Sequence, residues 1–175
     1  MKRIGIIGGG AWGTALATAA RRAGRDVILQ AREAEVVAAI NEDHENTPFL
    51  PGIGLDRAIR ATNELAEAAD ADAVLLAVPA QHLRAVATAL SPHWPDGVPA
   101  VICAKGIEQE TCALMSEVVE QSLPGVPYAV LSGPTFAAEV ARDLPTAVTL
   151  ATTERTLGET LAAAIGTPRF RTYLS

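Results

Sequence analysis

The stretch RIGIIGGGAWGTALATAARRAG, residues 3–24, decides the fold class of this chain. Residues 3–7 predict a strand, and residues 11–23 predict an alanine-rich helix that ends at Gly24. Three consecutive glycines stand between the two elements, although glycine weakens both strands and helices. Their presence indicates that something must approach the backbone closely at this turn.

Gly8, Gly10 and Gly13 form a G-x-G-x-x-G pattern directly after the strand and at the start of the helix. In this context the pattern is typical of a dinucleotide site. Gly8 allows the tight turn, Gly10 lets a pyrophosphate approach the main chain, and Gly13 lets helix and strand pack closely. The helix N-terminus offers free N–H groups to the phosphates. An S-adenosylmethionine or flavin site, or a turn with incidental glycines, remains an alternative, and Trp12 either contacts the cofactor or supports the loop.

The composition limits the class of protein. The chain has 175 residues, is 49% hydrophobic and 19% charged, and contains only 4% aromatic residues, which predicts one domain with an aliphatic core. No run of about 18 apolar residues exists, so no membrane span is expected. A net charge of -6 argues against nucleic-acid binding. No signal peptide is expected, and Cys103 and Cys112 are interpreted as reduced core residues, so the predicted location is cytoplasmic.

Strand patterns alternate with helical patterns along the whole chain. Further strands are expected at residues 26–30, 59–61, 73–78, 100–104, 128–132, 147–151 and 170–174. Further helices are expected at residues 33–41, 63–69 (capped by Asn63), 81–90, 111–123, 135–142 and 154–165. Residues 44–55 contain two prolines and two glycines and are expected to form a loop. The alternation predicts an α/β fold: a doubly wound, mainly parallel Rossmann-type sheet of about six to eight strands with helices on both faces.

The end of the second strand bears on the choice of cofactor. NAD sites usually place an acidic residue there, whereas this strand ends in Gln30 and is followed by Ala31 and Arg32. An arginine suits the 2′-phosphate of NADPH because its planar fork binds phosphate oxygens bidentately. The alternative is a solvated surface arginine accompanied by Glu33 and Glu35.

Three later strand ends carry polar residues: residues 77–82 (AVPAQH), 103–108 (CAKGIE) and 131–136 (LSGPTF). Ligands of doubly wound sheets bind at these carboxyl ends. Pro134 is expected in the first turn of the next helix, with main-chain N–H groups near Thr135 facing a bound anion.

Lys105 is the only lysine inside the predicted fold, because every other basic residue except Lys2 is an arginine. A lysine in such a chain suggests that a compact ammonium is required, bridging a substrate oxygen and the cofactor. The alternative is a surface lysine without a role. The three histidines have no metal-ligand spacing, and His82 is expected on a helix surface. Ser132 does not lie in a nucleophile elbow.

Together these motifs resemble bacterial NAD(P)-dependent glycerol-3-phosphate dehydrogenases. The matching pieces are GGGAWGTALA (residues 8–17), HENTPFLPGIGL (44–55), VLLAVPAQ (74–81), AKGIE (104–108) and LSGPTFAAEVARDLPTAV (131–148). The resemblance implies reversible hydride transfer between NAD(P)H and dihydroxyacetone phosphate, which gives sn-glycerol 3-phosphate for phospholipid synthesis. It also implies NADPH as cofactor, with NADH possible. The implied nucleotide contacts, besides the glycines, are Ala11, Trp12, Arg32, Phe49, Lys105 and Ala137, and the implied substrate contacts are Lys105, Gly133 and Thr135.

Members of the family continue into a helical C-terminal domain, whose G-A-x-K-N motif carries the lysine that transfers the proton. The resemblance therefore implies that residues 1–175 form the dinucleotide-binding domain, that no catalytic residue lies within them, and that they are inactive alone. It implies a homodimer for the family, without fixing the assembly of this chain. Two rival functions remain: a related hydroxyacid or ketopantoate reductase, and a ligand sensor that binds a dinucleotide to regulate a partner.

Overall fold

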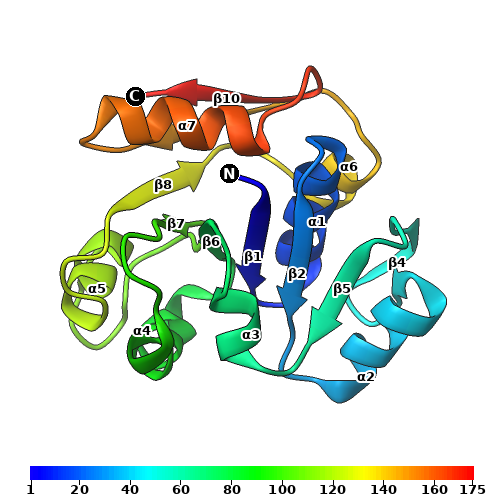
Figure 1. Ribbon diagram of the computed structural model, residues 1–175, viewed down its shortest axis with the longest axis horizontal. Coiled ribbons are helices and arrows are strands. Elements are labelled where there is room, and N and C mark those ends of the chain that lie inside the picture. Colours follow the sequence, from blue (N-terminus) through cyan, green and yellow to red (C-terminus); the bar gives the residue numbers. More distant parts are fainter.

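The main sheet has eight strands in the order β10-β9-β8-β7-β6-β1-β2-β5, seen in the computed structural model of residues 1–175 (Figure 1). Neighbouring strands are parallel except for β8 and β9, which pair antiparallel. The strands are β1 (Arg3–Ile7), β2 (Asp26–Gln30), β5 (Ile59–Thr62), β6 (Ala73–Leu76), β7 (Ala100–Ile102), β8 (Tyr128–Ser132), β9 (Thr146–Ala151) and β10 (Phe170–Leu174). From β1 the chain runs outward first through β2 and β5, and then in the other direction through β6, β7 and β8. The prediction of a doubly wound, mainly parallel sheet is confirmed.

Helices cover both faces of this sheet. The regular helices are α1 (Ala11–Arg22), α2 (Ala34–Ala38), α3 (Leu65–Ala69), α4 (Ala80–Leu90), α5 (Met115–Ser122), α6 (Ala137–Ala141) and α7 (Arg155–Ile165). A π-helical turn, η1 (Ala39–Asp43), continues α2, and a 3₁₀ turn, η2 (Ser91–His93), follows α4. One apolar core joins the sheet to α1, α6 and α7, and a second joins it to α3, α4 and α5. Two such cores explain why the central strands are apolar on both faces.

Strand β6 shows this two-sided burial most clearly. All four of its residues are fully buried. Leu75 faces the core under α1, whereas Val74 and Leu76 face the core under α4 and α5. The switch point of the sheet lies between β1 and β6: strands β2 and β5 are added on one side of it, and β7 and β8 on the other. Ligands of such sheets bind outside the carboxyl ends of the strands at this point.

The expectation of a loop at residues 44–55 is wrong. This segment forms a small antiparallel sheet of β3 (Glu45–Asn46) and β4 (Leu50–Gly54). Leu50 and Ile53 are buried in the core under α1, and Asn46 is fully buried as well. Burial of these side chains orders a segment whose proline and glycine content alone predicts a turn.

The helices expected from residues 63 and 111 both begin later than the sequence predicts. The helix expected from residue 111 begins at Met115, because residues 107–114 form a tight turn with a bridge between Ile107 and Leu114. Asn63 does not cap α3, which begins at Leu65 without a side-chain cap. The Asn63 amide instead donates to the carbonyls of the turn after β2.

The expected positions of one proline and one cysteine also need correction. Pro134 precedes α6, which begins only at Ala137, so it does not stand in the first helical turn. Cys103 is buried as expected, and this burial raises the pKa of its thiol. Cys112 is exposed in the turn before α5, with a left-handed φ of 58°, and is therefore not a core residue.

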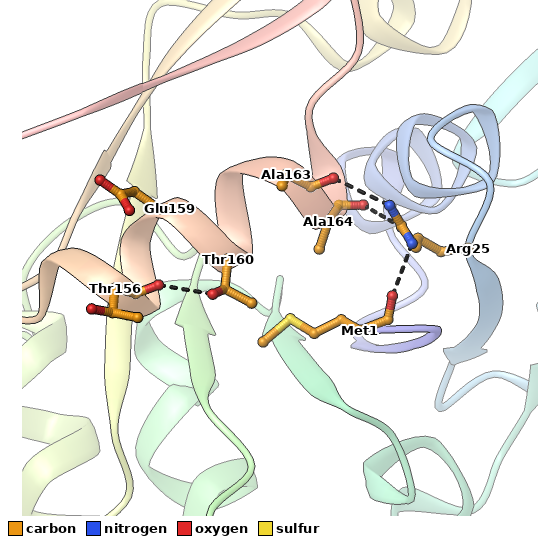
Figure 2. A pocket seen from close by; sticks show the side chains of 7 residues that line it. All are labelled: Met1, Arg25, Thr156, Glu159, Thr160, Ala163 and Ala164. Carbon is orange, nitrogen blue, oxygen red and sulfur yellow. Dashed lines mark hydrogen bonds between the residues drawn. The ribbon is translucent and has the colours of Figure 1, made fainter.

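A hollow of about 410 Å³ lies at the amino ends of β1 and β2, beside α7 (Figure 2). Arg25 donates there to the carbonyls of Ala163 and Ala164, at the end of α7, and to that of Met1. All three of its nitrogens are thus occupied by the chain itself, so Arg25 acts as a cap that fixes α7 to the sheet.

No helix in the structure combines the length and the apolar character that a membrane crossing needs.

Candidate dinucleotide site

A cleft with a volume of about 850 Å³ opens at the carboxyl ends of the central strands. It lies on the opposite edge of the sheet from the hollow at Arg25. Most residues that were predicted to contact a nucleotide line it: Gly8, Gly10, Ala11, Trp12, Arg32, Phe49, Lys105 and Ala137. Of the predicted substrate residues, Lys105 and Thr135 line the cleft. Gly13, which is buried, and Gly133, which is partly exposed, are not among the residues that line the cleft.

Three of the four glycines in the loop are required by packing. A Cβ on Gly13 would lie 1.9 Å from the Gly8 carbonyl oxygen, and a Cβ on Gly9 would lie 2.4 Å from the Ala31 Cβ. Gly8 has a φ of 114°, and a Cβ there would lie 2.9 Å from the Ala77 carbonyl group. The need for glycine thus follows from main-chain crowding at Gly8 and Gly13 and from the Ala31 side chain at Gly9.

Gly10 differs from its neighbours because a Cβ there would meet no atom within 4 Å. It stands at the N-cap of α1, where no side chain caps the helix. The first N–H groups of α1 are therefore available to a ligand that approaches from the cleft. The open space at Gly10 fits a group that needs close access to this backbone, such as a pyrophosphate.

The Asn46 side chain holds the glycine loop in place through hydrogen bonds. Its Nδ2 donates to the Gly9 carbonyl at 2.8 Å and to Thr14 Oγ1 at 2.7 Å, and its Oδ1 accepts from the Phe49 N–H at 3.3 Å. A buried amide with all these partners links the β3–β4 hairpin, which carries Phe49 into the cleft, to the glycine loop. Sequence reasoning missed this residue because nothing in the local pattern distinguishes it from a loop asparagine.

Lys105 and Trp12 meet across the cleft. The Lys105 Nζ lies 5.5 Å from the centre of the Trp12 ring, which is within cation–π range, and donates to the Gly133 carbonyl at 2.7 Å. The buried Trp12 Nε1 has no hydrogen-bond partner, and neither has the buried Thr135 Oγ1. Buried polar atoms of this kind normally have partners, so their position in a cleft wall fits a polar ligand.

The expectation of free N–H groups near Thr135 is wrong for Thr135 itself. Its N–H donates to the Gly133 carbonyl at 3.0 Å, the same oxygen that accepts from Lys105. The tight turn after β8 satisfies this donor internally. The hydroxyl of Thr135, not its amide, is the group left without a partner.

The loop that carries Lys105 is fixed to α4 by two side chains. Arg84 donates from Nε and Nη2 to the two carboxylate oxygens of Glu108, at 2.8 Å each, and Thr111 donates to the same carboxylate. Gln81 donates to the Ile107 carbonyl and accepts from the Gln109 N–H. The Arg84 guanidinium and the Thr111 hydroxyl lower the pKa of Glu108 to about 2, so the pair stays charged.

Arg32 reaches the cleft from the turn after β2 and is 87% exposed. Its Nε and Nη2 both donate to Oε1 of Glu33, at 3.1 and 2.8 Å, and Glu33 also lines the cleft. The pKa of Glu33 is lowered by its own backbone N–H and by Arg32. An acid therefore does stand at this strand end, one residue beyond the arginine that the sequence points to.

Other candidate chemistry has little support in the cleft. His82 lies exposed on α4 at the rim of the cleft, as expected. The structure contains no cluster of three or more histidine, cysteine or acidic residues suited to a metal ion.

Comparison with known proteins identifies the family. Residues 3–158 match the family described as the N-terminus of NAD-dependent glycerol-3-phosphate dehydrogenase. The chain belongs to this family. The resemblance seen in the motifs is therefore confirmed over most of the chain.

Individual relatives agree with the family assignment. Glycerol-3-phosphate dehydrogenase [NAD(P)+] of Paramagnetospirillum magneticum is 67% identical over the whole chain, and that of Caulobacter vibrioides is 57% identical over 98% of it. The crystal structure of the Coxiella burnetii enzyme superposes with a TM-score of 0.93 over 99% of the chain, at 32% identity. The chain spans 64%, 52% and 54% of these proteins' respective lengths.

Proposed function

We propose that the cleft binds a nicotinamide dinucleotide, with NADPH as the main cofactor and NADH as a second one. The observation that carries this proposal is the glycine loop: its packing glycines fix the turn, while Gly10 leaves open space beside uncapped N–H groups. This geometry suits a pyrophosphate at a helix N-terminus. The names of the relatives include NAD(P)+ and support the same cofactors.

The proposed nucleotide contacts are those of the cleft wall. The unpartnered Trp12 Nε1 supplies a donor, Arg32 supplies a guanidinium for the 2′-phosphate, and Phe49 supplies an apolar surface. Lys105 contacts both the cofactor and the substrate. Gly133 and Thr135 belong to the substrate side, where the Thr135 hydroxyl is a free partner for a phosphate or hydroxyl group.

For the whole protein we propose the reversible reduction of dihydroxyacetone phosphate to sn-glycerol 3-phosphate, as the relatives' names indicate. The bound nicotinamide supplies or accepts the hydride. The developing alkoxide needs a proton from a group within hydrogen-bond reach. Lys105 is assigned a binding role here, since its Nζ is shared between the Gly133 carbonyl and the Trp12 ring.

Residues 1–175 are proposed to be the dinucleotide-binding domain and to turn over poorly alone. The resemblance places the proton-transferring lysine in a further helical domain, and loss of a general acid costs about 10²–10⁴-fold in rate. Mixing the purified chain with NADPH and dihydroxyacetone phosphate tests this, with nicotinamide absorbance as the readout. Turnover close to that of a full-length relative would place the chemistry within these residues.

A homodimeric assembly and a cytoplasmic location stay predictions.

A thermal-shift screen with NADPH, NADH and dihydroxyacetone phosphate tests the binding proposal. A ligand that binds only the folded chain raises its stability, by about 2.7 kcal/mol at a concentration 100 times the dissociation constant. We expect a large shift with NADPH, a smaller one with NADH, and a weak one with the phosphate substrate. No shift with either dinucleotide would reject the proposal. A dinucleotide shift without any effect of the phosphate substrate would favour the ligand-sensor alternative.

A further inference from the structure

We propose that Glu33 is a determinant of cofactor specificity, which holds the Arg32 guanidinium in an ion pair and so reduces the preference for a 2′-phosphate. The inference rests on the proposed function, because it assumes that the dinucleotide lies in the cleft. It goes beyond that function by assigning a role to an acid that the motifs leave unassigned. It also predicts the direction in which a single substitution moves the NADPH to NADH ratio.

The first step of the argument is the geometry of the pair. Arg32 directs Nε and Nη2 to one carboxylate oxygen of Glu33, and these two nitrogens form the edge that binds a phosphate bidentately. A 2′-phosphate must therefore displace Glu33 or accept weaker contacts. Only Nη1 of Arg32 has no partner among the chain's own groups.

The second step is the fixed position of the main-chain turn that carries both residues. Asn63 donates from Nδ2 to the Ala31 and Arg32 carbonyls, at 2.8 and 3.3 Å, and the Ala31 N–H donates to the Thr62 carbonyl. The turn after β2 is thus bound to the end of β5. Glu33 is also partly buried, with a side chain 30% exposed, whereas the Arg32 side chain is 87% exposed. The carboxylate is therefore part of the cleft wall, while the arginine side chain extends into solvent.

The third step is charge. The 2′-phosphate of NADPH carries close to two negative charges at neutral pH, so the Glu33 carboxylate beside it repels it. The ribose 2′-hydroxyl of NADH is a donor that a carboxylate accepts, as acids at this strand end do in NAD sites. The pair therefore offers the Arg32 guanidinium to NADPH and the Glu33 carboxylate to NADH. Because the two groups bind each other, each weakens the contact that the other makes with its cofactor.

The test measures dissociation constants of NADPH and NADH by calorimetry for the purified chain and for Glu33→Gln. The glutamine keeps the size of the side chain and removes its charge. We expect the NADPH to NADH affinity ratio to rise about tenfold, and the gain to shrink at high salt because screening weakens exposed charges. Glu35→Gln is the matched control, since Glu35 is a neighbouring exposed acid outside the cleft lining and loses the same charge. We expect it to leave the ratio unchanged.

A double-variant cycle separates the ion pair from simple repulsion. In an Arg32→Ala background the Glu33→Gln change should raise the ratio by less than in the wild type, because the pair no longer exists to be broken. Three results would each overturn the inference while both dinucleotides still bind. The Glu33→Gln change could leave the affinity ratio unchanged, Glu35→Gln could change it equally, or Glu33→Gln could have its full effect in the Arg32→Ala background. Failure of the wild-type chain to bind either dinucleotide would instead reject the proposed function, and the inference with it.

Discussion

The two walls of the cleft are built in different ways. The glycine wall (residues 8–13 with Asn46 beneath) is made of main chain so crowded that a Cβ at Gly13 would lie 1.9 Å from a carbonyl oxygen. The lysine wall (residues 103–108 and 131–137) is made of side chains, and its Lys105 and Phe136 are exposed. The glycine wall is thus sensitive to an added atom at Gly8, Gly9 and Gly13, whereas Gly10 leaves room for one. The lysine wall depends on a few polar contacts that hold its loops in place.

Gly10→Val is expected to have the largest effect, on binding alone. The branched side chain enters open space, so the fold persists, but it occupies the place proposed for the pyrophosphate. We expect the NADPH dissociation constant to rise at least about 1000-fold, equivalent to about 4 kcal/mol. Calorimetric titration measures this, with circular dichroism as the check on folding. A folded variant with unchanged affinity would remove the functional distinction between Gly10 and its neighbours.

Gly13→Ala is expected to act on stability. The new methyl group meets the Gly8 carbonyl, which belongs to the backbone and cannot rotate away. We expect the free energy of unfolding to fall by about 1–3 kcal/mol, the range typical of overpacked cores. Urea denaturation measures it, and Gly10→Ala is the matched control, for which less than about 1 kcal/mol is expected. Equal losses in both variants would contradict the crowding argument for the glycine wall.

Arg32→Ala is expected to weaken NADPH selectively. Loss of a charge-assisted hydrogen bond to the 2′-phosphate costs about 1.5–3 kcal/mol. NADH lacks that phosphate, so its affinity should change little. Fluorescence titration with both cofactors measures the difference. Equal losses for the two cofactors would show that Arg32 contacts a part of the nucleotide that they share.

The smallest expected effect concerns the lysine wall and depends on pH. Arg84 and Thr111 lower the pKa of Glu108 from its usual 4.5 to about 2 in the folded chain. A lowered folded-state pKa means that the carboxylate stabilises the fold above about pH 4.5, and that this contribution is lost as the pH falls towards 2. Urea midpoints of the wild type and Glu108→Gln should therefore differ at pH 7 and converge as the pH approaches 2. A gap that stays constant over this range would show that the pair does not stabilise the loop.

The elements that the sequence predicts well are those with strong local patterns. The strand at residues 3–7, the glycine turn and the apolar strand at β6 follow from apolar runs and from glycine spacing, and the structure confirms them. The β3–β4 hairpin could not be predicted because its order depends on burial of Leu50 and Ile53 against distant helices. Such contacts between distant segments cannot be predicted from the local amino-acid composition.

The candidate site shows the same division. Most of the predicted nucleotide residues line one cleft, since they lie at strand ends that the sheet order brings together. Asn46 and the Arg84–Glu108 pair were missed because their partners are distant in sequence, 37 residues away for the Asn46 bond to Gly9. From the sequence alone, Glu33 is only a charged neighbour of Arg32, since no sequence pattern predicts that the two side chains bind each other.

A crystal structure of this chain with NADPH is the most direct test of the central claim, that the glycine loop binds the pyrophosphate. The account predicts phosphate oxygens within hydrogen-bond distance of the uncapped N–H groups at the start of α1, beside Gly10. It also predicts the 2′-phosphate near Arg32. A pyrophosphate bound elsewhere, such as in the hollow beside Arg25 (Figure 2), would contradict it.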